Sequence, residues 1–220
     1  PLNDLERENA TPPAVGRTGG PRGELGTPDG CRVSGFVPRG MPVVPPQSAP
    51  KENRMPTKME EPRELFLHEL GDLLYAENLL IKELPKLAQE ASDEELSGAF
   101  EAHREETKQH AANLEQVFEL IGEQPKAEQC PGIDGIKTEH DEFIKQQRPS
   151  PEVCDLFLTG AGARAEHYEI AAYTGLITMA QAMGESDAVV LLQENLKQEK
   201  AALEKLERAA TRLSREHVTA

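Results

Sequence analysis

The stretch LLYAENLL, residues 73–80, carries the pattern that decides the fold. In an α-helix, residues three, four and seven apart lie on one face, and this face is apolar when it packs against other elements. Glu77 falls in the middle of such a face, among Leu70, Leu73, Leu74, Leu80, Ile81 and Leu84. Burying an unpaired carboxylate is costly, so something must compensate the charge of Glu77.

Four long helices are predicted after Pro62, over residues 63–91, 93–122, 151–183 and 186–216. Their ends carry residues that commonly start or stop a helix: Ser92 with Glu95, Ser150 with Pro151, Ser186, Gly122 and Gly184. Helices of this length are longer than most helices of globular proteins. They are typical of helix bundles.

The connections between these helices predict how they are arranged. Very short turns join the first helix to the second and the third to the fourth, so each pair is antiparallel. The connection 123–150 is long enough to run the length of a bundle, and it contains a short amphipathic helix over 133–146. We therefore predict an all-α, ferritin-like four-helix bundle whose one long crossover, between the second and third long helices, carries a short helix.

Residues 1–61 differ in composition from the rest of the chain. They hold 11 of the 17 prolines and 8 of the 17 glycines, without helical or strand periodicity. Such a segment buries too little apolar surface to offset the entropy of an ordered chain. We expect residues 1–61 to be a disordered Pro/Gly-rich segment and residues 62–220 to be the ferritin-like bundle domain.

The formal charge of −15 belongs to the predicted bundle, because residues 1–62 carry 8 basic and 8 acidic residues. An acidic domain repels nucleic-acid phosphates and anionic lipids. No apolar run approaches the roughly 20 residues that cross a bilayer. We expect no nucleic-acid and no membrane partner. Three widely spaced cysteines and the lack of a secretory pattern favour the cytoplasm.

The run GAGARA, residues 160–165, matches the dinucleotide-binding pattern G-x-G-x-x-A. That pattern binds phosphate only where it joins a strand to a helix in a βαβ unit. Only CDLFLT, residues 154–159, resembles a strand. We interpret GAGARA as small residues that let a helix pack closely.

The apolar faces of the other three long helices also carry glutamates near their middle: Glu106, Glu166, Glu169 and Glu199. No lysine or arginine lies on these faces, and clustered carboxylates raise one another's pKa. Two metal ions would supply the missing positive charge. Bundle-core sites of this kind take one Glu from each of two helices and a Glu-x-x-His from each of the other two. The candidate ligands are therefore Glu77, Glu106, Glu166, Glu169 and Glu199.

Two histidines share the face of Glu106. His110, four residues after it, is a candidate ligand. His103, three residues before it, is either a ligand or a histidine that supports the core. Gln109 occupies the strict Glu-x-x-His position. Tyr173 is interpreted as an ordinary core tyrosine, and the alternative is that it contacts the metal ligands.

The segments ELFLHELGDLLYAENLLIKELPKLA, HREETKQHAANLEQVFELIGEQPK and RAEHYEIAAYTGL resemble the bacterial YciF/YciE-like proteins of the ferritin-like superfamily. The resemblance covers residues 63–216. It implies a four-helix ferritin-like fold, a homodimer, a di-iron-type site and a cytoplasmic stress protein. The sequence departs from ferritin relatives at Gln109 and at Ala202, where a histidine is expected. A site with so few imidazoles is rich in oxygen ligands, which suits Fe(III) or Mn better than copper.

The expected function is that of a di-iron carboxylate protein in stress defence, with two iron ions per chain and manganese as the alternative metal. It would react with O₂ or H₂O₂, either by oxidising Fe(II) or by consuming peroxide. A manganese catalase-like enzyme uses the same kind of ligands. The alternative from another class is a non-enzymatic helical stress protein whose metal is structural or absent.

Overall fold

The computed structural model describes residues 58–218. Residues 1–57, on which most of the predicted disordered segment falls, lie outside the described part. The described residues form five helices and no strand: α1 (Pro62–Glu90), α2 (Glu94–Leu120), α3 (Pro131–Gln147), α4 (Pro151–Met183) and α5 (Ser186–Val218). The predicted all-α fold with four long helices and one short one is confirmed.

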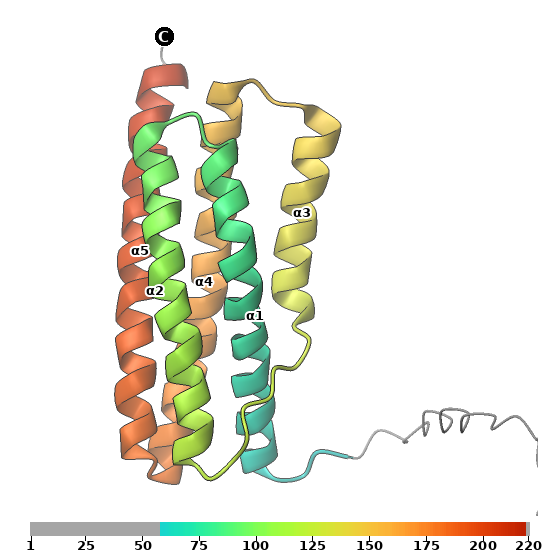
Figure 1. The fold of residues 1–220 in the computed structure, drawn as a ribbon, viewed down its shortest axis with the longest axis vertical. Helices are drawn as coiled ribbons and strands as arrows, with labels where there is room; N and C mark the ends of the chain where they lie inside the picture. Colours follow the sequence, from blue (N-terminus) through green and yellow to red (C-terminus); the bar gives the residue numbers. More distant parts are fainter. Residues whose placement is uncertain (1–57, 219–220) are drawn as a thin grey trace, which may run out of the picture. The chain divides into compact units, whose positions relative to one another are not determined.

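Four of the helices form the bundle (Figure 1). Helix α1 packs against α2 and α4, and α5 packs against the same two helices, so that neighbouring helices are antiparallel. The crossover, residues 121–150, returns the chain to the starting end of α2. Helices α2 and α4 therefore run in the same direction, which is the ferritin-like arrangement.

Helix α3 lies outside the bundle, beside α1 and α4 (Figure 1). Tyr75 of α1 donates a hydrogen bond to Asp134 over 2.9 Å. The His140 Nε2 atom lies 2.7 Å from the Glu90 carboxylate, also on α1. Phe143 stacks on Phe157 of α4 with 3.8 Å between the ring centroids. The crossover helix is thus fixed to both helices that it covers.

The helix ends agree with the sequence signals except at the starts of α2 and α5. Ser186, predicted to cap the last helix, is instead the first residue of α5. Gly122 and Gly184 both have φ of +79°, the left-handed conformation that glycine adopts without strain. Ser150 caps α4, as predicted. The capping box predicted at Ser92 is wrong, because the N-cap of α2 is Asp93, whose carboxylate accepts from the Leu96 N–H group over 2.9 Å.

Ser92 instead joins the α1–α2 turn to α4. Its backbone N–H donates to the Asp155 carboxylate over 2.8 Å, and its hydroxyl donates to the other oxygen of the same carboxylate. Asp155 is buried, so these contacts satisfy a charged group that water does not reach. This tertiary contact, which the local sequence does not show, replaces the local cap.

The GAGARA run lies in the middle of α4, with no strand before it. A methyl group added at Gly162 would lie 2.9 Å from a Leu206 side-chain carbon of α5. The interpretation of these residues as small ones that allow close packing agrees with this distance, and the dinucleotide-binding alternative is excluded by the helix.

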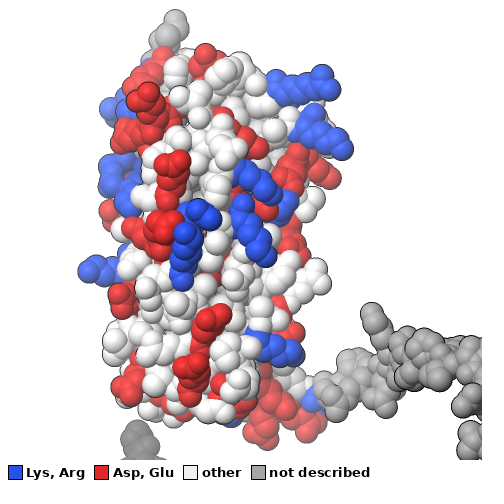
Figure 2. Space-filling model, in the orientation of Figure 1, with Lys and Arg blue, Asp and Glu red and all other residues white. Residues whose placement is uncertain are grey.

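The surface of residues 58–218 carries both signs of charge. Figure 2 shows acidic and basic side chains interspersed over one face. None of the five helices combines the length and the apolar composition that a bilayer crossing requires.

We predict that Asp155→Ala lowers the free energy of unfolding by about 1–3 kcal/mol, because it removes the buried carboxylate that accepts both hydrogen bonds from Ser92. Asp155→Asn should cost less, since the amide oxygen can still accept from the Ser92 N–H group. Urea denaturation of both variants measures the effect, with exposed Glu101→Ala on α2 as the control. Equal stability of Asp155→Ala and the wild-type protein would contradict the role assigned to Asp155.

Candidate metal centre

Six ionisable side chains from four helices meet midway along the bundle. Helix α1 supplies Glu77 and α5 supplies Glu199, and the other four, in pairs from α2 and α4, are His103, His110, Glu166 and Glu169. All six are buried. Each sits on the core-facing stripe of its helix, above and below leucine, alanine or phenylalanine, so the packing of the stripes brings the six together.

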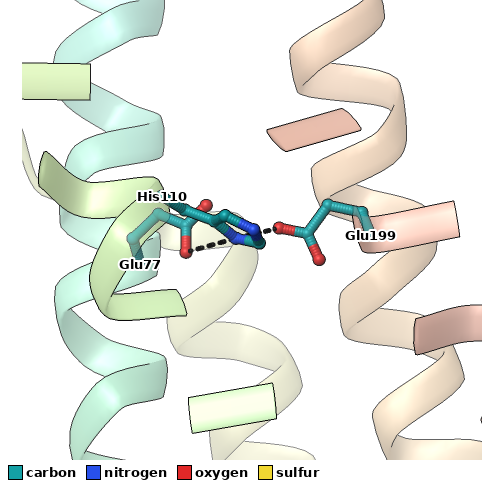
Figure 3. Close-up of side chains that lie close together, drawn as sticks. All are labelled: Glu77, His110 and Glu199. Carbon is teal, nitrogen blue, oxygen red and sulfur yellow. Dashed lines mark ion pairs between the residues drawn. The ribbon is translucent and has the colours of Figure 1, made fainter. Parts of the chain in front are cut away.

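The first group of potential ligands is Glu77, His110 and Glu199 (Figure 3). The His110 Nδ1 atom lies 2.7 Å from Glu199 Oε1 and 3.6 Å from Glu77 Oε2. Figure 3 shows the imidazole between the two carboxylates, which point toward it from α1 and α5. One ligand atom from each residue lies within 4.8 Å of the other two, close enough for one ion to contact all three.

The second group is His103, Glu166 and Glu199. The His103 Nε2 atom lies 3.2 Å from Glu166 Oε1 and 3.6 Å from Glu199 Oε2. Glu199 therefore belongs to both groups, with a different oxygen facing each histidine. A carboxylate in this position can bridge two ions. The two imidazole rings lie 6.1 Å apart, centroid to centroid.

Glu169 is fully buried, and neither of its carboxylate oxygens has a hydrogen-bond partner. Burial raises its pKa well above the usual value, and the charges of Glu199, Glu77 and Glu166 raise it further. Its carboxylate is thus electrostatically part of both groups, although it belongs to neither three-residue set.

The unsatisfied atoms show that the site fits a metal. Within residues 58–218, every buried side-chain nitrogen or oxygen without a hydrogen-bond partner belongs to five of these six residues: Glu77, His110, Glu166, Glu169 and Glu199. The close pair His110 Nδ1 and Glu199 Oε1 is included, because the two atoms are near but are not aligned as donor and acceptor. Native proteins rarely leave such atoms without partners, and cations shared among these residues would supply partners for them.

The electrostatics of the site also call for positive charge. Burial raises the pKa of Glu77 and of Glu199, and neighbouring carboxylates add to the effect. Burial alone would lower the pKa of His110, but the carboxylates of Glu199 and Glu77 outweigh it and raise that pKa to about 10. The pKa of His103 is likewise raised, against burial, by Glu106 and Glu166. Without a cation, the raised pKa values of Glu77, Glu169, Glu199 and both histidines favour the binding of protons at the site.

A second layer of contacts orients both histidines. The Nδ1 atom of His103 lies 3.1 Å from Glu106, and the Nε2 atom of His110 lies 2.9 Å from the Gln198 side-chain oxygen. In each ring the other nitrogen faces the carboxylates of the site. Partners of this kind fix the tautomer and the ring orientation of metal-binding histidines.

Tyr173 is more than an ordinary core tyrosine. Its hydroxyl donates a short hydrogen bond to Glu77 and accepts one from the Asn195 amide over 3.0 Å. Asn113 donates to Asn195 over 2.7 Å, so a buried amide pair supports the tyrosine. Sequence reasoning missed both asparagines. The spacing would have found them, because Asn195 lies four residues before Glu199 and Asn113 three after His110.

Glu106 is the one predicted ligand that the structure does not bring into the centre. At about 100° per residue, it is displaced by roughly 60° around α2 from His103, whereas His110 is displaced by only about 20°. Its side chain is 33% exposed, and it contacts His103 and, over 3.5 Å, Lys205. Gln109 is exposed and donates to Asn113 over 2.9 Å. Glu106 thus acts on the centre through His103.

Comparison with known proteins places these features in a family. Residues 61–219 match the family described as "Domain of unknown function (DUF892)". The chain is 39% identical to Protein YciF of Escherichia coli (strain K12) over 144 residues, which are 65% of this chain and 86% of that protein.

Solved structures agree with that match. The crystal structure of the E. coli stress protein YciF is 37% identical, with a TM-score of 0.68 over 71% of this chain and 99% of that one. YcfI from Rhodopseudomonas palustris is 37% identical, with a TM-score of 0.67 over 70% of this chain and 97% of that one. The chain therefore belongs to the DUF892 family and is a YciF-like protein with a ferritin-like fold.

Proposed function

We propose that this protein holds two iron ions between its four bundle helices and uses them to react with O₂ or H₂O₂ in stress defence. The observation that carries the proposal is the set of unpartnered buried oxygens and nitrogen in two ligand groups that share Glu199. The description of the E. coli relative as a stress protein supports the physiological setting.

The donor set and its charge suit two divalent ions. Four buried carboxylates, those of Glu77, Glu166, Glu169 and Glu199, carry four negative charges when ionised, which two divalent ions neutralise. Two imidazoles complete a set rich in oxygen, which iron and manganese accept more readily than copper does. Manganese is therefore the alternative metal, and a manganese catalase-like activity is the corresponding alternative reaction.

The chain supplies the geometry, and the ions would supply the electrons. Two Fe(II) ions would each give one electron, so that O₂ and two protons become H₂O₂, or H₂O₂ and two protons become two water molecules. Glu199 belongs to both ligand groups and would contact both ions, and Glu106 and Gln198 hold the two imidazoles in place. Tyr173 orients Glu77 through its hydroxyl. The homodimer and the cytoplasmic location stay predictions of the family resemblance.

One observation favours the non-enzymatic alternative. The raised pKa values of His103 and His110 allow two imidazolium ions to neutralise part of the carboxylate charge. A metal-free bundle can therefore persist as a helical stress protein, at some cost in stability. Metal analysis separates this alternative from the di-metal proposal.

We predict about two ions per chain after anaerobic reconstitution with Fe(II). Glu77→Gln and Glu166→Gln should each remove mainly one ion, whereas Glu199→Gln should reduce both, because only Glu199 belongs to both groups. Elemental analysis gives the stoichiometry, and anomalous scattering gives the positions. Glu106→Gln serves as the control for a residue outside both groups and should weaken binding without removing a position. Unchanged metal content in Glu199→Gln would refute the shared carboxylate.

His110→Ala should lower metal affinity by roughly tenfold or more, whereas Gln109→Ala should change it much less. The reason is that His110 points between Glu77 and Glu199, while Gln109 is exposed and contacts Asn113. Competition with a chromophoric chelator measures both affinities. A larger loss from Gln109→Ala would show that α2 is rotated relative to the structure.

The metal-free protein should lose stability as pH rises from about 5 to about 10. The folded-state pKa values of Glu77, Glu169, Glu199 and both histidines lie above their unfolded values. Each group therefore binds more protons when folded, and the stability that this binding provides is lost as pH rises through the folded pKa.

Urea denaturation of chelator-treated protein at several pH values measures this slope. Carboxylates with lowered pKa values, such as Asp93 and Glu106, titrate below this range and do not oppose it. Glu169→Gln removes one of the ionising groups, so its slope should be smaller. If wild-type protein and Glu169→Gln showed the same slope, or if stability rose with pH, the buried cluster would not control the pH dependence of stability.

A further inference from the structure

We infer that O₂ reaches the centre through an apolar chamber beneath α3 and arrives at the position between His103 and Glu166. The chamber, a cavity of about 50 Å³, is lined by residues of α1, α2, α3 and α4. His103 and Glu166 are among its lining residues, whereas Glu77, His110, Glu169 and Glu199 are not. The O₂ role rests on the proposed di-metal function, but the chamber itself does not.

The exposure of the six central residues shows which side of the centre is open. Glu77, His110, Glu169 and Glu199 have no exposed surface, whereas His103 is 6% exposed and Glu166 is 4% exposed. A second cavity touches the same two residues from the side of Lys205, but it measures only about 10 Å³. One water molecule needs roughly 10–15 Å³, so the chamber beneath α3 is the wider route.

The lining of the chamber selects an uncharged apolar molecule. Its walls are mostly leucine, isoleucine, phenylalanine and alanine, with Leu84 from α1, Ile133 and Ile136 from α3, and Ala161 and Ala165 from α4. Five polar residues complete the lining. His103 and Glu166 belong to the metal centre, and Glu83, Lys137 and His140 come from α1 and α3.

The size and polarity together favour O₂ over the other reactants. Space for about three water molecules does not admit a metal ion with its hydration shell. H₂O₂ would fit, but along these walls it would lose hydrogen bonds to water without replacing them, which is costly. O₂ has no such bonds to lose. The chamber also makes the two ion positions unequal, because the Glu77–His110 side is closed.

Small residues of α4 create this space. Ala161 and Ala165 leave a gap toward α1, which Ile133 and Ile136 of α3 cover without filling it. A larger side chain at Ala161 should therefore occupy the chamber. Ala163, two residues further along, faces a groove on the α5 side of the same helix and is the matched control position.

The first test uses xenon, an apolar atom that binds in dry cavities, and needs no metal. Crystals of the metal-free protein under xenon pressure should show anomalous density in the chamber of the wild-type protein and of Ala163→Leu, but not of Ala161→Leu. An empty wild-type chamber, or xenon retained in Ala161→Leu, would overturn the proposed chamber whatever the metal content of the protein.

The second test measures oxidation of bound Fe(II) by O₂ at matched metal content. Ala161→Leu should slow the reaction at least about tenfold, and Ala163→Leu should stay within about twofold of wild type. If Ala161→Leu does not fold, Ile136→Phe fills the same chamber from α3, outside the bundle. If the wild-type chamber binds xenon but the filled variants oxidise Fe(II) with O₂ at the wild-type rate, the chamber does not deliver O₂. The delivery role would also be refuted if filling the chamber slowed only the reaction with H₂O₂. Failure to bind iron at all would refute the di-metal proposal and leave the xenon result standing.

Discussion

The structure depends on the cost of keeping four carboxylates away from water. Each of Glu77, Glu166, Glu169 and Glu199 lies at the level where four helices meet, and α5 places Glu199 opposite two histidines of α2. In a low-dielectric interior such charges repel one another strongly. The leucine-rich layers above and below keep the helices together, but they do nothing to offset that repulsion. The bundle therefore requires cations or protons at its centre.

The choice between cations and protons links stability to function. With protons, the site is a set of partly neutral acids and charged imidazoles, and its stability is sensitive to pH. With ions, the same oxygens become ligands and the histidines must give up their protons, so binding releases protons into the solvent. Glu106, Gln198 and Tyr173 hold their partners through hydrogen bonds without any metal. The site is therefore arranged before any ligand enters.

Much of this arrangement was predictable from helical periodicity alone. Glu77, Glu199 and the pair Glu166 and Glu169 stand out because each interrupts an apolar stripe, and their burial follows from the stripe. The orientation of Glu106 was not predictable in this way. A residue at the edge of an apolar stripe points inward or outward depending on a few tens of degrees of helix rotation, and tertiary packing sets that rotation. Ser92 shows the same limit. Its local cap competes with Asp155, which lies 63 residues away in the sequence.

The crossover is longer than its span requires. Helix α2 has 27 residues and so measures about 40 Å, a distance that roughly a dozen extended residues can cover. The chain instead uses residues 121–150 and folds 17 of them into α3. The additional length forms α3, which covers the seam between α1 and α4. A deletion that kept the bundle intact but shortened this connection would leave the inner helices in place and open their apolar seam to water. The crossover, which resembles a linker in sequence, thus shields part of the bundle interior from water.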